Sequence, residues 1–592
     1  MEAITKNGSL SQTLVHCGPK SLSSFIPVRC LRFSKNPFPK KLVVTRARTS
    51  INSDHEAANR PLFQFPPSLL DDRFLSISAN QSEIDSLGRD IEALKAKVSE
   101  KLVCMDVKER IHLIHLLVSL GVAYHFEKQI EEFLKVDFEN VEDMNLGEED
   151  MYSISVIFRV FRLYRHKLSS DVFNRFKEEN GDFKKCLLDD VRGMLSFYEA
   201  SYFGTNTEEI LDEAMGFTRK HLELFVGGSN EEHLSGHIKN VLYLSQQENA
   251  EVVMSREYIQ FYEQETHHDE TLLKFAKINF KFMQLHYVQE LQTIVKWWKE
   301  LDLESKIPNY YRVRAVECLY WAMAVYMEPQ YSVARIILSK SLVLWTIIDD
   351  LYDAYCTLPE AIAFTENMER WETDAKDMPD HMKVLMRSFI DLHEDFKREV
   401  ILEGRLYSVE YGIDECKRLF REDLKLSKWA RTGYIPNYDE YMEVGIVTAG
   451  IDMTVAFAFI GMGEAGKEAF DWIRSRPKFI QTLDIKGRLR DDVATYKDEM
   501  ARGEIATGIN CYMKQYKVTE EEAFLEFHRR IKHTSKLVNE EYFKTTVPLK
   551  LVRIAFNVGR AIDTNYKHGD GLTYGGIVEG QITSLFLDLI TI

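Results

Sequence analysis

The sequence predicts an all-α protein with two helical domains, and three observations support this. Only 14 of the 592 residues are proline, and none lies between positions 68 and 307. Proline costs about 3 kcal/mol in a helix interior, and β-folds usually mark turns with it, so this stretch favours helix. Hydrophobic residues, at 45%, are sufficient for buried cores. Ile111, Ile114, Leu117 and Val118 recur at three and four residues, as in an amphipathic helix.

The first 50 residues differ in composition from the rest of the chain. They contain nine lysines and arginines, seven serines and one acidic residue, whereas the whole chain has a net charge of −17. A basic, serine-rich, acid-poor leader is typical of an organelle transit peptide. We expect residues 1–50 to be a plastid transit peptide; a tail without a targeting function is the alternative. The acidic remainder argues against nucleic-acid binding, which requires a basic surface.

A change of composition at residues 265–310 indicates a junction between two domains. Histidines and acids at 267–270 give way to an aromatic-rich segment at 276–301. We place an N-terminal helical domain at 59–271 and a C-terminal domain at 272–592. The second domain contains nearly all the clustered acids and arginines that could act in catalysis.

Two other features exclude classes of protein. The eight cysteines occur singly, without a C-x-x-C pair, which argues against a zinc site or a disulfide framework. The best candidate for a membrane span, 446–463, is only 18 residues long and is interrupted by Gly450 and Asp452. We therefore expect a buried helix lining a pocket, without stable membrane insertion.

The sequence Ile-Ile-Asp-Asp-Leu-Tyr-Asp at 347–353 predicts a cation site. In a helix, Asp349 and Asp353 lie one turn apart on one face, and Asp350 lies about 100° away. Three carboxylates at the end of an apolar helix are costly unless cations neutralise them. Such oxygen ligands suit magnesium, which shares its remaining positions with water and substrate phosphates. Taken alone, the motif could also be a solvated acidic turn.

A second acidic helix is predicted at 487–499. Asp491, Thr495 and Glu499 recur every four residues. Helical geometry stacks their oxygens along one face, where they can chelate a further magnesium ion. A capped surface helix is the alternative for this segment alone.

Three arginines lie close to these acidic motifs in the sequence. Arg312 and Arg314 form an R-x-R pair before the first motif, and Arg488 stands one turn before the second. Guanidinium groups are permanently charged and match phosphate oxygens. The three arginines are therefore candidates for holding a diphosphate.

The order of these motifs resembles that of plant terpene synthases. It consists of the R-x-R pair, an aromatic-rich segment at 321–331, D-D-x-x-D at 349–353, and D-D-x-x-T-x-x-x-E at 491–499. Arg502-Gly503-Glu504 continues the match, which covers the chain from about residue 59 to its end. The resemblance implies a C-terminal class I terpenoid synthase bundle that contains the pocket. It also implies an N-terminal α-barrel-like domain that is a relic without its own catalysis.

The resemblance assigns roles to individual residues. Three magnesium ions, with manganese as an alternative, are expected on the metal ligands Asp349, Asp353, Asp491, Thr495 and Glu499. Contacts to the substrate are expected from Arg312, Asp349, Asp353, Arg488 and Asp491. Catalytic roles are expected for Arg312, Arg314, Trp321, Arg488 and Tyr566. Asp350 is expected to bond to arginine rather than to metal.

Trp321 and the C-terminal pair Tyr566 and Asp570 also resemble residues of the family. Trp321 resembles the aromatic floor of the pocket in the family, although plain core packing is its alternative role. A tyrosine that often follows the C-terminal acid by two residues in relatives is Leu572 here. This departure puts a proton relay at that place in doubt.

The implied reaction is magnesium-dependent ionisation and cyclisation of a linear prenyl diphosphate by a monomer. No D-x-D-D motif for protonation-initiated cyclisation is present. The plastid leader and the missing arginine element of plastid monoterpene synthases favour geranylgeranyl diphosphate, C20, and a cyclic diterpene hydrocarbon. Small residues in the expected pocket helix are consistent with a roomy cavity, although they could equally serve close helix packing: Gly445, Ala449, Gly450, Ala456 and Ala458.

Several alternatives remain open on the sequence. A C25 or C15 diphosphate could be the substrate in place of the C20 compound. A chain-elongating prenyltransferase usually carries two D-D-x-x-D motifs, whereas the second motif here has the synthase form. A non-catalytic helical scaffold predicts damaged metal motifs, and both motifs are intact.

Overall fold

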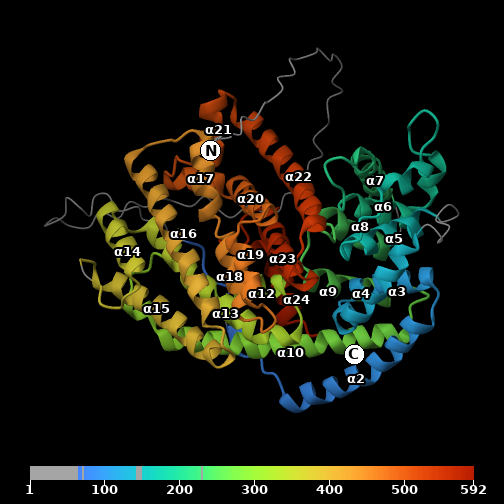
Figure 1. Cartoon of the computed structure of the whole chain (residues 1–592), viewed down its shortest axis with the longest axis horizontal. Coiled ribbons are helices and arrows are strands. Elements are labelled where there is room, and N and C mark those ends of the chain that lie inside the picture. The colour runs from blue at the N-terminus through green and yellow to red at the C-terminus, as the bar shows by residue number, and fades with distance from the viewer. Residues whose placement is uncertain (1–64, 70–71, 142–149, 229–230, 376) are drawn as a thin grey trace, which may run out of the picture. The chain divides into compact units, whose positions relative to one another are not determined.

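A computed structural model describes residues 65–69, 72–141, 150–228, 231–375 and 377–592 (Figure 1). The predicted transit peptide, residues 1–50, lies outside the described residues, as does the predicted start of the first domain at residue 59. The described residues contain helices and a single isolated bridge between Lys177 and Phe183, with no strand. The all-α prediction is therefore confirmed.

The first long N-terminal helix, α2, begins at Gln81. Asn80 caps the first long helix by accepting a hydrogen bond from the Ser82 backbone at 2.9 Å. The helices of this part are α1 (Asp72–Leu75), α2 (Gln81–Cys104), α3 (Val107–Ser119), α4 (Glu127–Glu139), α5 (Met151–Leu163), α6 (Val191–Ser201), α7 (Glu209–Gly228), α8 (Glu232–Tyr243) and α9 (Glu251–Glu263).

The C-terminal helices begin close to the predicted junction. Asp269 caps α10, accepting hydrogen bonds from two backbone amides of its first turn. The helices are α10 (Glu270–Leu301), α11 (Leu303–Lys306), α12 (Ala315–Val325), α13 (Ser332–Ala354), α14 (Leu358–Arg370), α15 (Asp380–Val400), α16 (Leu406–Thr432), α17 (Tyr438–Thr448), α18 (Ile451–Ile460), α19 (Lys467–Arg474), α20 (Lys478–Arg502), α21 (Gly508–Tyr516), α22 (Glu520–Lys544), α23 (Leu549–Tyr566) and α24 (Glu579–Phe586).

Six C-terminal helices pack in a closed ring. Along the ring, α12 contacts α13, followed by α16, α17, α20 and α23, and α23 returns to α12. The apolar helix α18 contacts four of them, α13, α16, α20 and α23. All ten residues of α18 are buried, so it forms part of the interior of this bundle.

The N-terminal helices brace one member of this ring. The backbone amide of Ala250 donates to the Thr564 hydroxyl at 3.0 Å, and Arg560 pairs with Glu251 at 2.5 Å. A further ion pair joins Lys567 to Glu248 at 2.7 Å. These contacts position α23, which contributes side chains to the cavity described below.

The segment expected to be one pocket helix is two helices. Gly450 adopts φ +69° between α17 and α18, a conformation that favours glycine. By length and composition two segments could cross a membrane, 329–354 and 438–460, but 72% of each apolar window is buried within the protein. A buried core helix satisfies the same criterion.

Candidate active site

A cavity opens at one end of the helical ring. It is lined from α12, α13, α16, α17, α18, α20 and α23 and from the segments at 502–507 and 570–573. Nine acidic side chains face it: Asp349, Asp350, Asp353, Asp423, Asp491, Asp498, Glu499, Glu504 and Asp570. Four arginines face it as well: Arg312, Arg431, Arg488 and Arg502. Charged side chains are therefore concentrated at this cavity.

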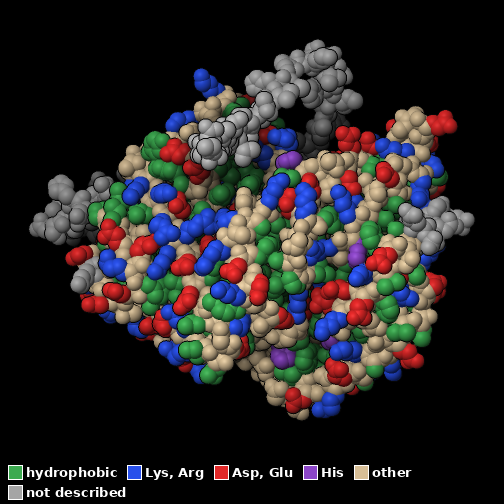
Figure 2. Space-filling model, viewed as in Figure 1, with side chains coloured by type: hydrophobic (Ala, Val, Ile, Leu, Met, Phe, Trp, Pro, Cys, Tyr) green, Lys and Arg blue, Asp and Glu red, His purple; other side chains and the backbone are tan. Residues whose placement is uncertain are grey.

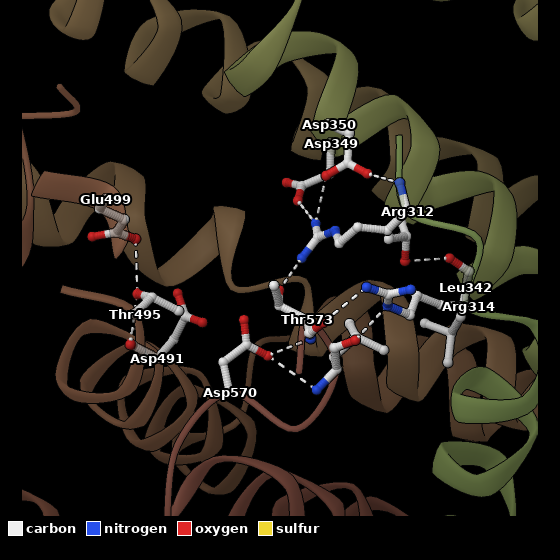
Figure 3. A network of polar contacts seen from close by, with 12 residues as sticks. Arg312, Arg314, Leu342, Asp349, Asp350, Asp491, Thr495, Glu499, Asp570 and Thr573 are labelled. Carbon is white, nitrogen blue, oxygen red and sulfur yellow. Dashed lines mark hydrogen bonds and ion pairs between the residues drawn. The ribbon is translucent and has the colours of Figure 1, made fainter. Parts of the chain in front are cut away.

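Arg312 joins the first acidic motif from the loop before α12. Its guanidinium lies 2.9 Å from Asp349 and 2.8 Å from Asp350, and its backbone amide donates to Asp350 at 2.6 Å. Figure 3 shows the guanidinium directed toward both carboxylates. Burial raises the pKa of Asp350 to about 7, while the Arg312 charge opposes that shift. Asp350 is thus bonded to arginine, as the resemblance implied.

Asp353 lies one turn beyond Asp349 and faces the same cavity. No hydrogen bond or ion pair to its carboxylate is found among the residues that the structure describes. Burial, followed by the charges of Asp349 and Glu504, raises its pKa well above the ordinary value. A carboxylate in this position needs a cation to remain charged.

The second motif lies on α20, on the other side of the opening (Figure 3). The Thr495 hydroxyl donates to Glu499 and to the backbone carbonyl of Asp491, both at 2.8 Å. The three oxygen-bearing side chains therefore share one helix face, as their spacing predicted. Burial and neighbouring acidic charges, first that of Glu504, raise the pKa of Glu499 to about 8.

The donor set fits magnesium ions. Both motifs present oxygens only, and acids outnumber arginines around the cavity. Hard oxygen ligands of this kind are those that magnesium prefers. Within the described residues, no three acidic, histidine or cysteine side chains are close enough to hold one ion by themselves. Magnesium sites shared between few protein ligands and a substrate phosphate agree with that separation.

Arg488 is held beside the second motif. It pairs with Asp491, and its Nε lies 3.0 Å from Asp492. Asp492 also accepts the Tyr441 hydroxyl at 2.5 Å, which ties α20 to α17. The missing side chain of Gly445 makes room for Arg488, since a β-carbon there would lie 2.8 Å from its Cδ.

Arg314 is placed differently from the other arginines. It is 1% exposed and does not line the cavity. Its guanidinium donates to the carbonyls of Leu572 and Thr573 at 2.8 Å and of Pro66 at 2.9 Å. Arg314 therefore binds the C-terminal loop and the start of the described chain together, while Arg312 reaches the acids.

The C-terminal loop at 570–573 lines the cavity next to Arg312. Asp570 accepts the backbone amides of Leu572 and Thr573, and the Thr573 hydroxyl accepts from Arg312 at 2.6 Å (Figure 3). Tyr566 also lines the cavity. Its pKa lies well above the ordinary value, mainly because the hydroxyl is buried and secondly because of the Asp570 charge.

Two tryptophans form the apolar part of the cavity. Trp321 lines it from α12 and Trp345 from α13, and neither indole nitrogen has a hydrogen-bond partner within the described chain. Trp345 lies against Gly450, where a β-carbon would be 2.8 Å from the indole ring. Phe65 adds a third ring, 4.9 Å from the Arg312 guanidinium.

The expected small residues contribute less to the cavity than their pattern suggested. Ala449 lines it, but Ala456 and Ala458 are fully buried and serve helix packing. The space at Gly445 is filled by Arg488, and that at Gly450 by Trp345. A roomy cavity therefore does not follow from these small residues.

Several cavity residues were not predicted from the sequence, among them Asp423, Trp345 and Phe65. Asp423 and Trp345 lie outside the recognised motifs, and Phe65 is far from them along the chain. Trp345 could have been predicted, because it stands one helical turn before Asp349 and therefore on the same helix face. No motif in the sequence around Asp423 or Phe65 indicated a place at the cavity, because their positions depend on packing between distant segments.

Family models match two parts of the chain. The model described as "Terpene synthase, N-terminal domain" matches residues 69–242, and "Terpene synthase family, metal binding domain" matches residues 299–537. The second match contains both acidic motifs.

Two Arabidopsis thaliana proteins are similar over their whole length. "Inactive terpenoid synthase 20, chloroplastic" is 91% identical over 592 residues, which cover 100% of both chains. "Dolabella-3,7-dien-18-ol synthase TPS06" is 48% identical, also over 100% of both chains.

Solved structures show the same fold. Limonene synthase with 2-fluorolinalyl diphosphate matches with a TM-score of 0.82 at 26% identity, covering 89% of this chain and 99% of that one. Isoprene synthase from grey poplar, in complex with three Mg²⁺ ions and dimethylallyl-S-thiolodiphosphate, has a TM-score of 0.79 at 26% identity. That match covers 86% of this chain and 99% of the poplar protein.

Proposed function

Because the chain belongs to the terpene synthase family, we propose that it ionises geranylgeranyl diphosphate and cyclises the cation to a diterpene hydrocarbon, releasing diphosphate. The observation that supports this best is the arrangement of the cavity. Two acidic helix faces, four arginines and two tryptophans line it. The acids and arginines suit a diphosphate with its cations, and the tryptophans suit a hydrocarbon.

The charged residues of the cavity would stabilise the diphosphate as it separates from the carbocation. Asp349 and Asp353 would hold cations on one side, and Asp491, Thr495 and Glu499 on the other, with manganese as an alternative to magnesium. Bound magnesium supplies positive charge that stabilises the leaving diphosphate. Arg312 and Arg488 would bind its oxygens, because both guanidinium groups face the cavity. The carbon–oxygen bond breaks, and its electron pair leaves with the diphosphate.

The apolar residues would act after ionisation. Aromatic faces attract cations, and a dry cavity prevents water from capturing the intermediate. Trp321 and Trp345 present such faces. Transfer of a proton from the cyclised cation to the released diphosphate then gives a hydrocarbon. We keep Tyr566 as a candidate for assisting this step and assign no relay to Leu572, which has no titratable group.

The C20 substrate is supported by a relative. The product in the name of the 48%-identical protein, dolabella-3,7-dien-18-ol, numbers a carbon 18, which requires a skeleton larger than C15. The 91%-identical protein is named chloroplastic, which agrees with the predicted transit peptide and places this protein in plastids. We propose the C20 diphosphate on these grounds, ahead of the C25 and C15 compounds, and a monomeric enzyme.

The word "inactive" in the name of the 91%-identical relative favours one other reading, a non-catalytic protein. In this chain both metal motifs are complete, and they line one cavity together with Arg312 and Arg488. Turnover with prenyl diphosphates, with magnesium and with excess chelator, tests the proposal. We expect a magnesium-dependent cyclic product. Consumption of a second five-carbon unit would show an elongating enzyme, and absence of any turnover a scaffold.

A further inference from the structure

One acid at the cavity belongs to neither metal motif. Asp423 lies on α16 and is 6% exposed, and its Oδ2 has no hydrogen-bond partner among the described residues. It lines the cavity together with the next residues on the same helix face, Leu426, Ser427, Ala430 and Arg431. A buried, unpaired carboxylate costs several kcal/mol, so its retention requires an explanation.

Two contacts fix Asp423 relative to the first motif. The Ser427 hydroxyl donates to the Tyr352 carbonyl at 3.1 Å, and the Arg431 guanidinium donates to the Cys356 carbonyl at 2.6 Å. Both pairs are 75 residues apart, so α16 and α13 run side by side in the same direction. One turn earlier on α16, Asp423 lies level with Ile348 and hence beside Asp349.

The surrounding charges agree with that position. Burial raises the pKa of Asp423 well above the ordinary value, and the Asp349 charge raises it further, as does Glu422 on the same helix. The Arg488 charge acts in the opposite direction. Asp423 is also among the acids that act on Asp353. Asp349, Asp353 and Asp423 therefore repel one another at one place on the cavity wall.

We propose that Asp423 is a third carboxylate of the cation site formed by Asp349 and Asp353, and that it acts through a water molecule of the bound cation. This inference rests on the proposed function, since it requires magnesium at the first motif. The register of α16 against α13 and the unpaired buried oxygen support it. Helix α16 thus contributes to the site an acid that the D-D-x-x-D pattern does not contain.

The test compares thermal unfolding of the full chain with that of Asp423→Asn, with EDTA and in titrations with magnesium plus inorganic diphosphate. With EDTA, the variant should unfold at the same or a higher temperature, because a repulsive charge is removed. With diphosphate, it should need at least tenfold more magnesium for half of the stabilisation. Glu422→Gln is the matched control, because it removes the neighbouring charge on α16, and its magnesium requirement should not change.

Three results separate the possibilities. A variant that unfolds at a lower temperature with EDTA and needs the wild-type magnesium concentration has lost only a structural contact, which overturns the inference. The same holds if both variants need equally more magnesium. If the wild type itself shows no stabilisation by magnesium and diphosphate, the proposed function fails, and the Asp423 assignment fails with it.

Discussion

Asp350 holds Arg312 through both its backbone and its side chain. One carboxylate oxygen accepts the Arg312 amide at 2.6 Å, and the other lies 2.8 Å from the guanidinium. The second aspartate of the first motif thereby fixes the arginine at the opening instead of facing a cation. Asp350 is 1% exposed, so little water competes with this pair.

Asp350→Asn should therefore reduce turnover without removing a metal ligand. We expect kcat/KM to fall about 100-fold, or roughly 2.7 kcal/mol, because Arg312 loses a charged partner and its orientation. The magnesium requirement should change little. Steady-state kinetics at several magnesium concentrations measure both quantities. An unchanged kcat/KM would contradict the positioning role.

Asp349→Ala and Asp353→Ala should abolish turnover and leave the fold intact. Asp353 has no partner within the described chain, so its loss removes repulsion rather than a contact. Losing a metal-mediated charge contact costs at least roughly 2–3 kcal/mol of transition-state stabilisation. Asp391→Ala, at an exposed position on α15, is the control. Near-wild-type turnover in either variant would disprove the metal assignment.

Gly450→Ala should alter the product more than the rate of ionisation. The new methyl group would meet the Trp345 ring, and φ +69° is unfavourable for alanine by about 1 kcal/mol. Displacing Trp345 changes the cavity wall that shapes the cation. Gas chromatography of the products measures the effect. Gly463→Ala, which has open space around it, should give the wild-type product pattern.

Asp563→Ala should destabilise the bundle. Asp563 is fully buried on α23 and pairs with Lys486 and with Arg490, the latter at 2.8 Å. Lys486 would lose its carboxylate, and Arg490 would keep only Glu248, at 3.5 Å. This should lower the free energy of unfolding by about 3–5 kcal/mol, measured by urea titration. Glu223→Ala, which breaks an exposed pair with Arg219, should cost less than about 1 kcal/mol. Equal losses in the two variants would falsify this account of α23.

A reporter fused to residues 1–50 should enter plastids. The basic, serine-rich and acid-poor composition of this segment predicts import. Microscopy of the fusion checks localisation, and mass spectrometry of the imported protein locates the cleavage site. Replacing its lysines and arginines by glutamine should abolish import. A reporter that stays in the cytosol would show that the leader has no targeting function.

The local parts of this site could be predicted from sequence. Asp491, Thr495 and Glu499 share a face because a helix repeats every 3.6 residues, and the same rule placed Asp349 with Asp353. Asp423 and Phe65 could not be predicted, because their positions depend on how distant segments pack. The expected single helix at 446–463 was wrong, because the positive φ of Gly450 divides it. A glycine within an apolar run does not by itself reveal that break.

Both the chemistry and the substrate length can be tested by measuring kcat/KM of the leaderless protein with C10, C15, C20 and C25 prenyl diphosphates, each with products analysed by gas chromatography. We expect a cyclic C20 hydrocarbon that forms only with magnesium, and a kcat/KM for the C20 substrate at least tenfold above the others, or roughly 1.4 kcal/mol of preference. A tenfold preference for the C15 or C25 substrate would contradict the substrate assignment. No cyclic product from any of the four would contradict the proposed chemistry itself.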